Sequence, residues 1–370
     1  MRIAFDYHAF YLQSYGGISR YFVRLAEHLA LLKQEIGIFA PMHRNLYLKD
    51  LPAGIVHGFG VKNYPSRGSS VIQALNYQLS SQLIKNWKPQ LVHETFYSYK
   101  GIACGLFPTV VTVYDMIQER FLNNISKNDN ASKLKRIVIE RADHVICISE
   151  STRRDLLNYF GINDKKVSVV YLGVDRISNA YLCIQPLVVT KRPFLLYVGY
   201  REGYKNFFGF ISAIASSKKL IMDFDIVAFG GGKFTQFELA LLLESGIKPD
   251  NVRQIGGDDT LLGQLYQHAS AFVYPSLYEG FGLPPLEAMA HNCPVISSKT
   301  SSMPEVIGDA GEFFDPNSID DIAAAIERVV YSPNRVRDLV KRGQNRINHF
   351  SWEQCAKETL DIYRTLGDFA

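Results

Sequence analysis

The most informative stretch of the sequence is residues 274–290, which read YPSLYEGFGLPPLEAMA. An apolar run ends at Tyr274, a loop with two glycines follows, and a helix is expected to begin near Leu283, because proline is favoured in the first turn of a helix. The amides at such a helix N-terminus attract anions, and Gly280 and Gly282 let a phosphate approach the backbone closely. The segment therefore predicts a strand, an anion-binding loop and a helix.

Two glutamates flank this loop, Glu279 before the glycines and Glu287 one turn into the expected helix. Carboxylates accept hydrogen bonds from sugar hydroxyls, so a phosphate on the loop amides would have such an acceptor on each side. Two glutamates at this spacing also suit a helix cap and an exposed helix position. The surrounding Gly-Phe-Gly-Leu-Pro sequence favours the binding site.

The rest of the chain alternates short β-branched apolar runs with amphipathic stretches, which is typical of parallel α/β sheets. Each half of the chain fits an open, doubly wound sheet with helices on both faces. Strands are expected at Ile3–Phe5, Ile36–Phe39, Leu91–His93, Val110–Tyr114, His144–Ile148, Phe194–Val198, Phe224–Phe229, Val252–Ile255, Ala271–Tyr274 and Val295–Ser297.

The length of 370 residues predicts two domains. A plausible linker at 171–192 divides the chain into a Rossmann-like domain at 1–180 and a second at 181–351. The last helix, within 352–370, is expected to return to the first domain. Two such sheets facing each other would place a ligand crevice at the domain boundary.

Composition excludes several classes of protein. The chain is 47% hydrophobic and 21% charged, which rules out a disordered or fibrous protein. The sequence has no apolar run long enough for a membrane span, and its start lacks a signal-peptide layout. Five scattered cysteines lack metal-type spacing and indicate a reducing compartment, so a cytoplasmic location is predicted. No basic-aromatic module for nucleic acid is present.

The 274–290 segment resembles the retaining, nucleotide-sugar-dependent glycosyltransferases of family 4, which have the two-domain GT-B fold. The resemblance covers nearly the whole chain. Within the family, the chain is most similar to enzymes that build O-antigens and other bacterial surface polysaccharides, many of which are mannosyl- or rhamnosyltransferases. Further matching motifs are Gly16-Gly17-Ile18, Val145-Ile146-Cys147-Ile148-Ser149-Glu150-Ser151, Tyr197-Val198-Gly199, Lys205-Asn206 and Pro304-Glu305-Val306.

The resemblance implies a donor site in the second domain for a nucleotide diphosphate sugar, with GDP-mannose as the first guess. Arg201 and Lys205 follow the strand Phe194–Val198 and would bind the diphosphate and stabilise the leaving nucleotide. Glu279 would hold hydroxyls of the transferred sugar, and Glu287 would hold the ribose. The amides of Phe281, Gly282 and Leu283 would cradle the phosphates and the sugar.

In the first domain the resemblance implies that Gly16 and Gly17 approach the donor phosphate or the acceptor. A simple tight turn before a helix explains the same glycines. Relatives commonly carry His-Asp where this chain has Tyr114 and Asp115, so the usual histidine contact with the donor sugar is in doubt. Asp115 is the first candidate for contacting the acceptor hydroxyl or the donor sugar, and His93 is a further candidate contact.

The resemblance also implies retention of anomeric configuration without a protein nucleophile. The acceptor hydroxyl would attack the face from which the diphosphate leaves, and the enzyme would supply orientation and charge stabilisation. We expect no metal and no cofactor. Asp223-Phe224-Asp225 has the Asp-x-Asp pattern of metal-binding glycosyltransferases, but it introduces an expected strand and is set aside as a metal site.

Charge is unevenly distributed along the chain. Residues 1–180 hold 22 Lys and Arg against 14 Asp and Glu, whereas residues 181–370 hold 18 against 22. Basic clusters occur at 133–136 and 153–154, in the domain expected to hold the acceptor. Together with the resemblance, this favours a polyprenyl-diphosphate-linked glycan as acceptor and peripheral contact with the inner membrane, although ordinary surface charge gives the same pattern.

Alternatives remain open at this point. The same fold serves transferases that act on small soluble acceptors, nucleotide-sugar epimerases, and catalytically silent subunits of synthesis complexes. The 274–290 segment does not support a nucleotide-sugar epimerase. The intact Glu279, Glu287, Arg201 and Lys205 argue against a silent subunit, whereas Tyr114 keeps that alternative open.

Overall fold

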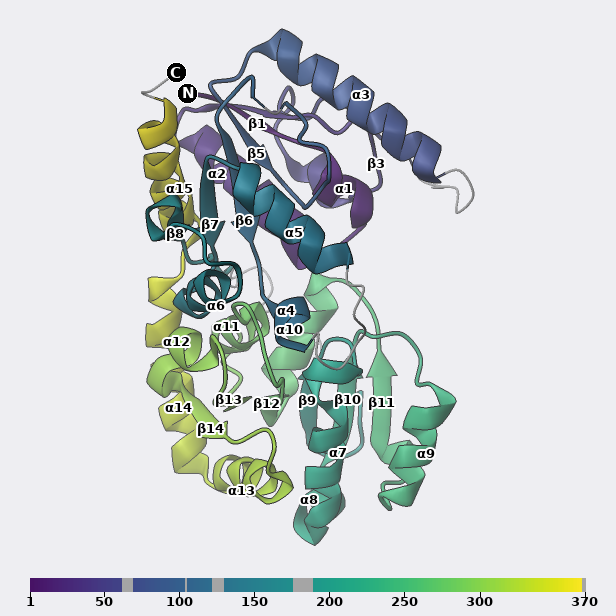
Figure 1. Cartoon of the computed structure of the whole chain (residues 1–370). Coiled ribbons are helices and arrows are strands. Elements are labelled where there is room, and N and C mark those ends of the chain that lie inside the picture. The colour runs from purple at the N-terminus through teal and green to yellow at the C-terminus, as the bar shows by residue number, and fades with distance from the viewer. Residues whose placement is uncertain (62–68, 104, 122–129, 176–188, 368–370) are drawn as a thin grey trace. The chain divides into compact units, whose positions relative to one another are not determined.

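The computed structural model describes residues 1–61, 69–103, 105–121, 130–175 and 189–367. The chain divides into two compact units (Figure 1). Unit 1 comprises residues 1–173 and 352–370, and unit 2 comprises residues 174–351.

Unit 1 is built on a parallel sheet with the strand order β2-β1-β5-β6-β7-β8. Its strands are β1 (Arg2–Phe5), β2 (Glu35–Ile38), β5 (Leu91–Glu94), β6 (Thr109–Val113), β7 (His144–Cys147) and β8 (Val167–Val169), and β3 (Met42–His43) pairs separately with β4 (Phe59–Gly60). Its helices are α1 (His8–Leu12), α2 (Gly17–Leu31), α3 (Ser69–Trp87), α4 (Ile117–Phe121), α5 (Asn130–Arg141), α6 (Glu150–Phe160) and α15 (Trp352–Gly367).

The C-terminal helix α15 packs against α2 within unit 1 (Figure 1). The ring of Trp352 lies 6.4 Å from that of Tyr21, and the buried Tyr363 reaches the sheet at His93. Phe22 and Leu25 of α2 are fully buried, and α15 contacts both α2 and β5, so the last segment of the chain contributes to the core of the first unit.

Unit 2 contains a parallel sheet with the order β11-β10-β9-β12-β13-β14. Its strands are β9 (Phe194–Val198), β10 (Asp225–Phe229), β11 (Val252–Ile255), β12 (Ala271–Tyr274), β13 (Val295–Ser298) and β14 (Gly311–Phe314). Its helices are α7 (Phe207–Ser216), α8 (Lys218–Asp223), α9 (Gln236–Glu244), α10 (Asp259–His268), α11 (Leu283–Ala290), α12 (Met303–Ile307), α13 (Ile319–Val330) and α14 (Pro333–Arg346).

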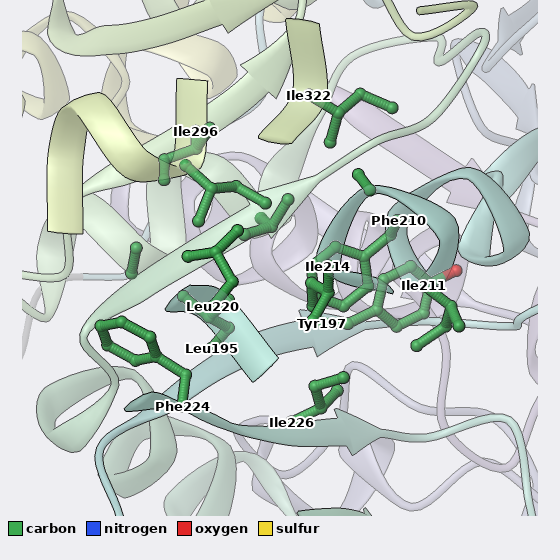
Figure 2. Packing of buried hydrophobic residues seen from close by; sticks show 14 of the residues in the cluster. Leu195, Tyr197, Phe210, Ile211, Ile214, Leu220, Phe224, Ile226, Ile296 and Ile322 are labelled. Atoms are coloured by element: carbon green, nitrogen blue, oxygen red, sulfur yellow. The ribbon is translucent and has the colours of Figure 1, made fainter. Parts of the chain in front are cut away.

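One face of this sheet forms a core with α7 and α13 (Figure 2). Alternate residues of β9, Leu195 and Tyr197, point to this face, because successive side chains of a strand alternate between its two sides. The ring of Tyr197 packs on Phe207 and Phe210 of α7, with ring centroids 5.0 and 6.1 Å away. This packing fixes the end of β9, from which the loop of the candidate site departs.

The predicted α/β fold with two Rossmann-like sheets is confirmed, and the structure adds elements that the sequence analysis did not propose. The edge strands β8 and β14 are short and partly exposed, so their apolar patterns are weak. The helix α3 was not proposed either, because its apolar residues do not gather on a clearly buried face. Val71, Leu75, Leu79 and Leu83 form an exposed stripe along it.

Candidate functional site

The candidate site of unit 2 lies where two loops leave the carboxyl ends of β9 and β12. These strands are neighbours, and the chain runs from β9 to β10 on one side, whereas β12 lies on the other side. Such a topological switch point makes the two following loops diverge and is where open α/β sheets bind ligands. The loops at this switch point are residues 199–206 and 275–282.

Hydrogen bonds fasten the two loops to each other. The amide of Leu277 donates to the carbonyl of Tyr204 at 2.7 Å, and Nδ2 of Asn206 donates to the carbonyl of Pro275 at 3.2 Å. Asn206 has φ of +53° and caps α7 by accepting from the amide of Gly209. The hydroxyl of Tyr197 donates to the carbonyl of Tyr200, so the core of unit 2 also holds the first loop.

This fastening brings Lys205 and Glu279 together. Nζ of Lys205 lies 2.7 Å from Oε1 of Glu279, and the two side chains are 15% and 10% exposed. Nζ also lies 5.5 Å from the centre of the Tyr274 ring. Burial and the neighbouring Glu279 carboxylate raise the pKa of Tyr274 well above its ordinary value. The structure therefore unites two predicted site residues as a mostly buried ion pair at the edge of the sheet.

The helix α11 begins at the same place. Gly282 precedes it with φ of +103°, a backbone conformation that residues with a Cβ rarely adopt. Among the described residues no side chain caps this N-terminus, and Pro284 and Pro285 have no N–H. The amides of Gly282 and Leu283 are thus the first donors at the positive end of the helix. Glu287 follows on α11, half-buried, with the hydroxyl of Tyr266 at 3.5 Å from its Oε2.

Two serines after β13 are hydrogen-bonded to the backbone of the loop at 275–282. The amide of Glu279 donates to Oγ of Ser301 at 2.8 Å, and Oγ of Ser302 lies 2.9 Å from the carbonyl oxygens of both Glu279 and Phe281. The sequence analysis missed both serines. The signal available was their position shortly before the Pro304-Glu305-Val306 motif, with Met303 between. They determine which way the peptide groups of the glycine loop face.

Arg201 is not part of this pair. Its guanidinium is 3% exposed and donates to both carboxylate oxygens of Glu238 and to the carbonyls of the glycine loop at 230–233. Phe234 packs on it, with 4.7 Å from the guanidinium carbon to the ring centre. The prediction that Arg201 and Lys205 together bind the diphosphate stays a prediction; among the described residues of unit 2 their side chains pair with different carboxylates, Arg201 with Glu238 and Lys205 with Glu279. The cause is the capping box of α9, in which Thr235 and Glu238 cap each other.

The predicted residues of the first half lie in unit 1. Gly17 begins α2, and the side chain of Gln13 reaches that N-terminus, where its Oε1 accepts from the amide of Ser19 at 3.1 Å. Asp115 follows β6. Its Oδ1 accepts from the amide of Ile117 at 3.1 Å, and its carbonyl accepts from Nζ of Lys135. A Cβ on Gly16 would lie 2.3 Å from Oε1 of Gln13, so this glycine makes room for that side chain.

His93 and Tyr114, the predicted sugar contacts, lie in the interior of unit 1, and their role towards a sugar stays a prediction. His93 is fully buried, and its ring nitrogens are hydrogen-bonded to the hydroxyls of Tyr363 and Thr112. The hydroxyl of Tyr114, also buried, donates to the carbonyl of Thr95 at 2.9 Å. Both side chains therefore join elements of unit 1.

Two family descriptions match this chain. Residues 15–176 match Glycosyltransferase Family 4, and residues 184–346 match Glycosyl transferases group 1. The chain belongs to the family 4 glycosyltransferases. The two matches together leave out only residues 1–14, 177–183 and 347–370.

One relative of this glycosyltransferase is the O-antigen chain mannosyltransferase B of Escherichia coli, which is 30% identical over 239 residues. The match covers 62% of each chain, so it spans less than two thirds of that relative's length. Among solved structures, the sucrose-phosphate synthase of Thermosynechococcus elongatus has a TM-score of 0.77 at 20% identity and full coverage of both chains. HepE of Anabaena, solved with UDP and glucose, has a TM-score of 0.77 at 17% identity and covers 99% of this chain and 100% of its own. The likeness to these structures shows the GT-B fold.

The basic clusters of the glycosyltransferase are partly neutralised within unit 1. Lys135 is buried and lies 2.7 Å from Glu119, Arg136 pairs with Glu140, and Arg153 pairs with Glu150 and Asp164. The prediction that the whole cluster forms a basic face is therefore wrong for Lys135. Within the described part of the chain, no helix is long and apolar enough to cross a membrane, and no group of three potential metal ligands gathers. In the set-aside Asp-x-Asp, Asp225 pairs with Arg192.

The burial of His93 makes the stability of unit 1 depend on pH. Burial lowers the pKa of His93 to about 3, against about 6.5 in an unfolded chain. Between these values the unfolded chain holds a proton that the folded chain lacks. This contribution to stability is complete above pH 6.5 and is lost as the pH falls towards 3, with a slope of up to about 1.4 kcal/mol per pH unit.

The measurement is urea unfolding at pH 7, 6 and 5, monitored by a signal from unit 1. In the wild type we expect the free energy of unfolding to fall with decreasing pH along this slope. The slope should be smaller in His93→Asn, whatever its absolute stability. A residual slope is expected because burial also lowers the pKa of His43, His57 and His144 in the same unit. The half-buried His144 provides the control, because His144→Asn should keep most of the slope. Equal slopes in the wild type and His93→Asn would contradict the neutral, buried state of His93.

Proposed function

We propose that this glycosyltransferase moves a hexose, with mannose as the first candidate, from a nucleotide diphosphate sugar to a glycan acceptor. The observation that carries the proposal is the Lys205–Glu279 pair beside the N-terminus of α11, at the switch point of unit 2. The name of the Escherichia coli relative, a mannosyltransferase of O-antigen chains, supports the choice of sugar and of pathway.

The site offers the two kinds of group that such a donor needs. Nζ of Lys205 and the amides of Gly282 and Leu283 supply positive charge for the diphosphate, which gains charge as it leaves. The carboxylate of Glu279, released from Lys205 when the phosphate takes its place, accepts hydrogen bonds from the hydroxyls of the transferred sugar. Glu287, half-exposed on the same helix, is the acceptor for the ribose hydroxyls.

We propose that the reaction retains the anomeric configuration and uses neither a metal nor a cofactor. The bond between the anomeric carbon and the phosphate oxygen breaks while the acceptor oxygen bonds to that carbon on the same face. The acceptor proton passes to the phosphate oxygen that leaves. The protein then contributes fixed charges and orientation, with no acid or base of its own.

The proposed acceptor is a lipid-linked glycan of surface-polysaccharide synthesis, reached on the cytoplasmic face of the inner membrane. Two features of unit 1 support a peripheral contact. Val71, Leu75, Leu79 and Leu83 form an exposed apolar stripe along α3, and the exposed Lys133 and Arg154 remain from the basic clusters. Apolar area and cations together are what bind a protein to an anionic bilayer.

A thermal-shift screen with GDP-mannose, UDP-glucose and dTDP-rhamnose tests the donor. A ligand at 100 times its Kd stabilises the folded protein by about 2.7 kcal/mol. We expect the largest rise in Tm with GDP-mannose, and no rise in Lys205→Met. Absence of a shift with all three donors, or the same shift in Lys205→Met, would contradict the proposed function and the proposed site respectively.

A further inference from the structure

Unit 1 has a switch point of its own, between β1 and β5. The chain leaves β1 for β2 on one side of the sheet, whereas β5 lies on the other side of β1. This is the same arrangement that places Lys205 and Glu279 between β9 and β12 in unit 2. Asp6 and His8 follow β1, Glu94 ends β5, and Thr95 comes directly after it. Neither the motifs of the sequence nor the proposed donor site uses these four residues.

The carboxylate of Asp6 is fully buried and accepts several hydrogen bonds. Its donors are the amides of Thr95 and His8, at 3.0 and 3.3 Å, the hydroxyl of Thr95, and Nδ1 of His8 at 2.8 Å. Burial alone would raise its pKa, but His8 and Thr95 hold it below its usual value. An ionised carboxylate cannot donate, so the proton in this contact is on Nδ1 of His8.

The other ring nitrogen of His8 has a different environment. The ring is 3% exposed and stacked on Tyr7, and Nε2 is buried without a hydrogen-bond partner among the described residues. A buried polar atom without a partner is unfavourable, because it has given up its hydrogen bonds with water and has gained none in the protein. Its neighbours are satisfied, since the oxygens of Glu94 accept from the amide of Ile102 and from Arg141. Nε2 is therefore a hydrogen-bond acceptor at the switch point for which the described residues provide no donor.

We propose that Nε2 of His8 accepts a hydrogen bond from a hydroxyl group of the glycan acceptor, and that Asp6 fixes the tautomer that makes this possible. The inference rests on the proposed function and adds the acceptor side to it. A neutral hydroxyl fits this position better than a phosphate, because the ring lies beside the carboxylate of Asp6, with that of Glu94 at the same switch point. His8 is a binding residue here and takes no proton from the substrate.

Two substitutions separate this role from a purely structural one. The amide nitrogen of asparagine can replace Nδ1 and keep the bond to Asp6, but nothing then occupies the position of Nε2. Glutamine places its amide near Nε2 and loses the bond to Asp6. A binding role predicts that His8→Asn loses more acceptor affinity than His8→Gln. If His8 is only structural, His8→Gln, which loses the bond to Asp6, should lower the stability of the protein more than His8→Asn.

The experiment measures the affinity of the GDP-bound enzyme for octyl α-mannoside, together with the thermal shift caused by GDP-mannose. We expect His8→Asn to weaken glycoside binding about tenfold, the equivalent of one hydrogen bond, and to keep the nucleotide shift. His144 lies at the amino end of β7, whereas the switch point lies at the carboxyl ends of the strands. The control His144→Asn should therefore leave both the glycoside affinity and the thermal shift unchanged. Equal affinity in the wild type and His8→Asn, or binding by neither, overturns the inference. If GDP-mannose causes no thermal shift in the wild type, the proposed function is contradicted instead.

Discussion

Replacement of Lys205 by methionine is expected to lower kcat/KM by about 10²–10³-fold, the usual effect of removing one preorganised group that stabilises developing negative charge. Methionine keeps nearly the length and the apolar stem of the side chain, whereas the charge that lies 2.7 Å from Glu279 and 5.5 Å from the centre of the Tyr274 ring is lost. Steady-state kinetics with GDP-mannose and a direct measurement of GDP affinity would show the loss in both quantities.

Glu279→Gln is the informative partner of this variant. If Lys205 binds the diphosphate and Glu279 holds the sugar, the glutamine variant keeps or improves GDP affinity, because Lys205 no longer has a competing carboxylate. Its turnover should nevertheless fall. Lys218→Met, an exposed lysine at the start of α8, is the matched control and should behave as the wild type. Unchanged GDP affinity in Lys205→Met would remove Lys205 from the proposed site.

The parts of this site that the sequence predicts are those that depend on local backbone physics. A strand that ends at Tyr274, a glycine with positive φ at position 282 and prolines in the first turn of α11 are properties of one continuous segment. Strand order then brings Lys205 to Glu279, because β9 and β12 are neighbours in any sheet of this topology. Both residues were named from the resemblance, whereas their ion pair was not predicted.

What the sequence did not predict depends on which partner a polar side chain finds across the fold. Arg201 and Lys205 look equivalent in the sequence, four residues apart in one loop. Yet Arg201 lies within reach of Glu238, 37 positions later, and Lys205 within reach of Glu279. Ser301 and Ser302 act on the glycine loop from the segment after β13. The pattern Thr235-x-x-Glu238 was a usable signal, since a capping box places its glutamate at a helix N-terminus.

The histidines of unit 1 show the same limit. His93 ends a strand at the sheet edge, which suggested a ligand contact, but the returning helix α15 supplies Tyr363 as its partner. His8, which no motif singled out, keeps an unpartnered nitrogen among the described residues. The difference lies in contacts between segments far apart in the sequence, which a single sequence does not report.

Arg201→Met is expected to lower the free energy of unfolding of unit 2 by about 3–5 kcal/mol, the typical result of breaking a buried ion pair from one side. Both side chains of the pair are nearly fully buried, and the guanidinium also holds the carbonyls of residues 230–233. Burial acts to raise the pKa of Glu238, but hydrogen bonds from Arg201 and Thr235 hold it below its usual value. This contribution is present above about pH 4.3 and is lost as the pH falls, so the difference between wild type and variant should shrink towards pH 4.

Urea unfolding at pH 7 and at about pH 3.5, below the pKa of a free glutamate, measures both effects. Arg328→Met is the control in the same unit: this arginine is about half exposed, and Glu312 keeps its second partner, Arg335, so the expected loss is below about 1 kcal/mol. The result also decides between two roles for Arg201. A residue that bound the diphosphate, as the sequence suggested, would leave stability nearly unchanged and weaken GDP binding when replaced. A residue that holds the glycine loop and Glu238 would reduce stability first, because the carboxylate it leaves behind is buried without a counter-charge.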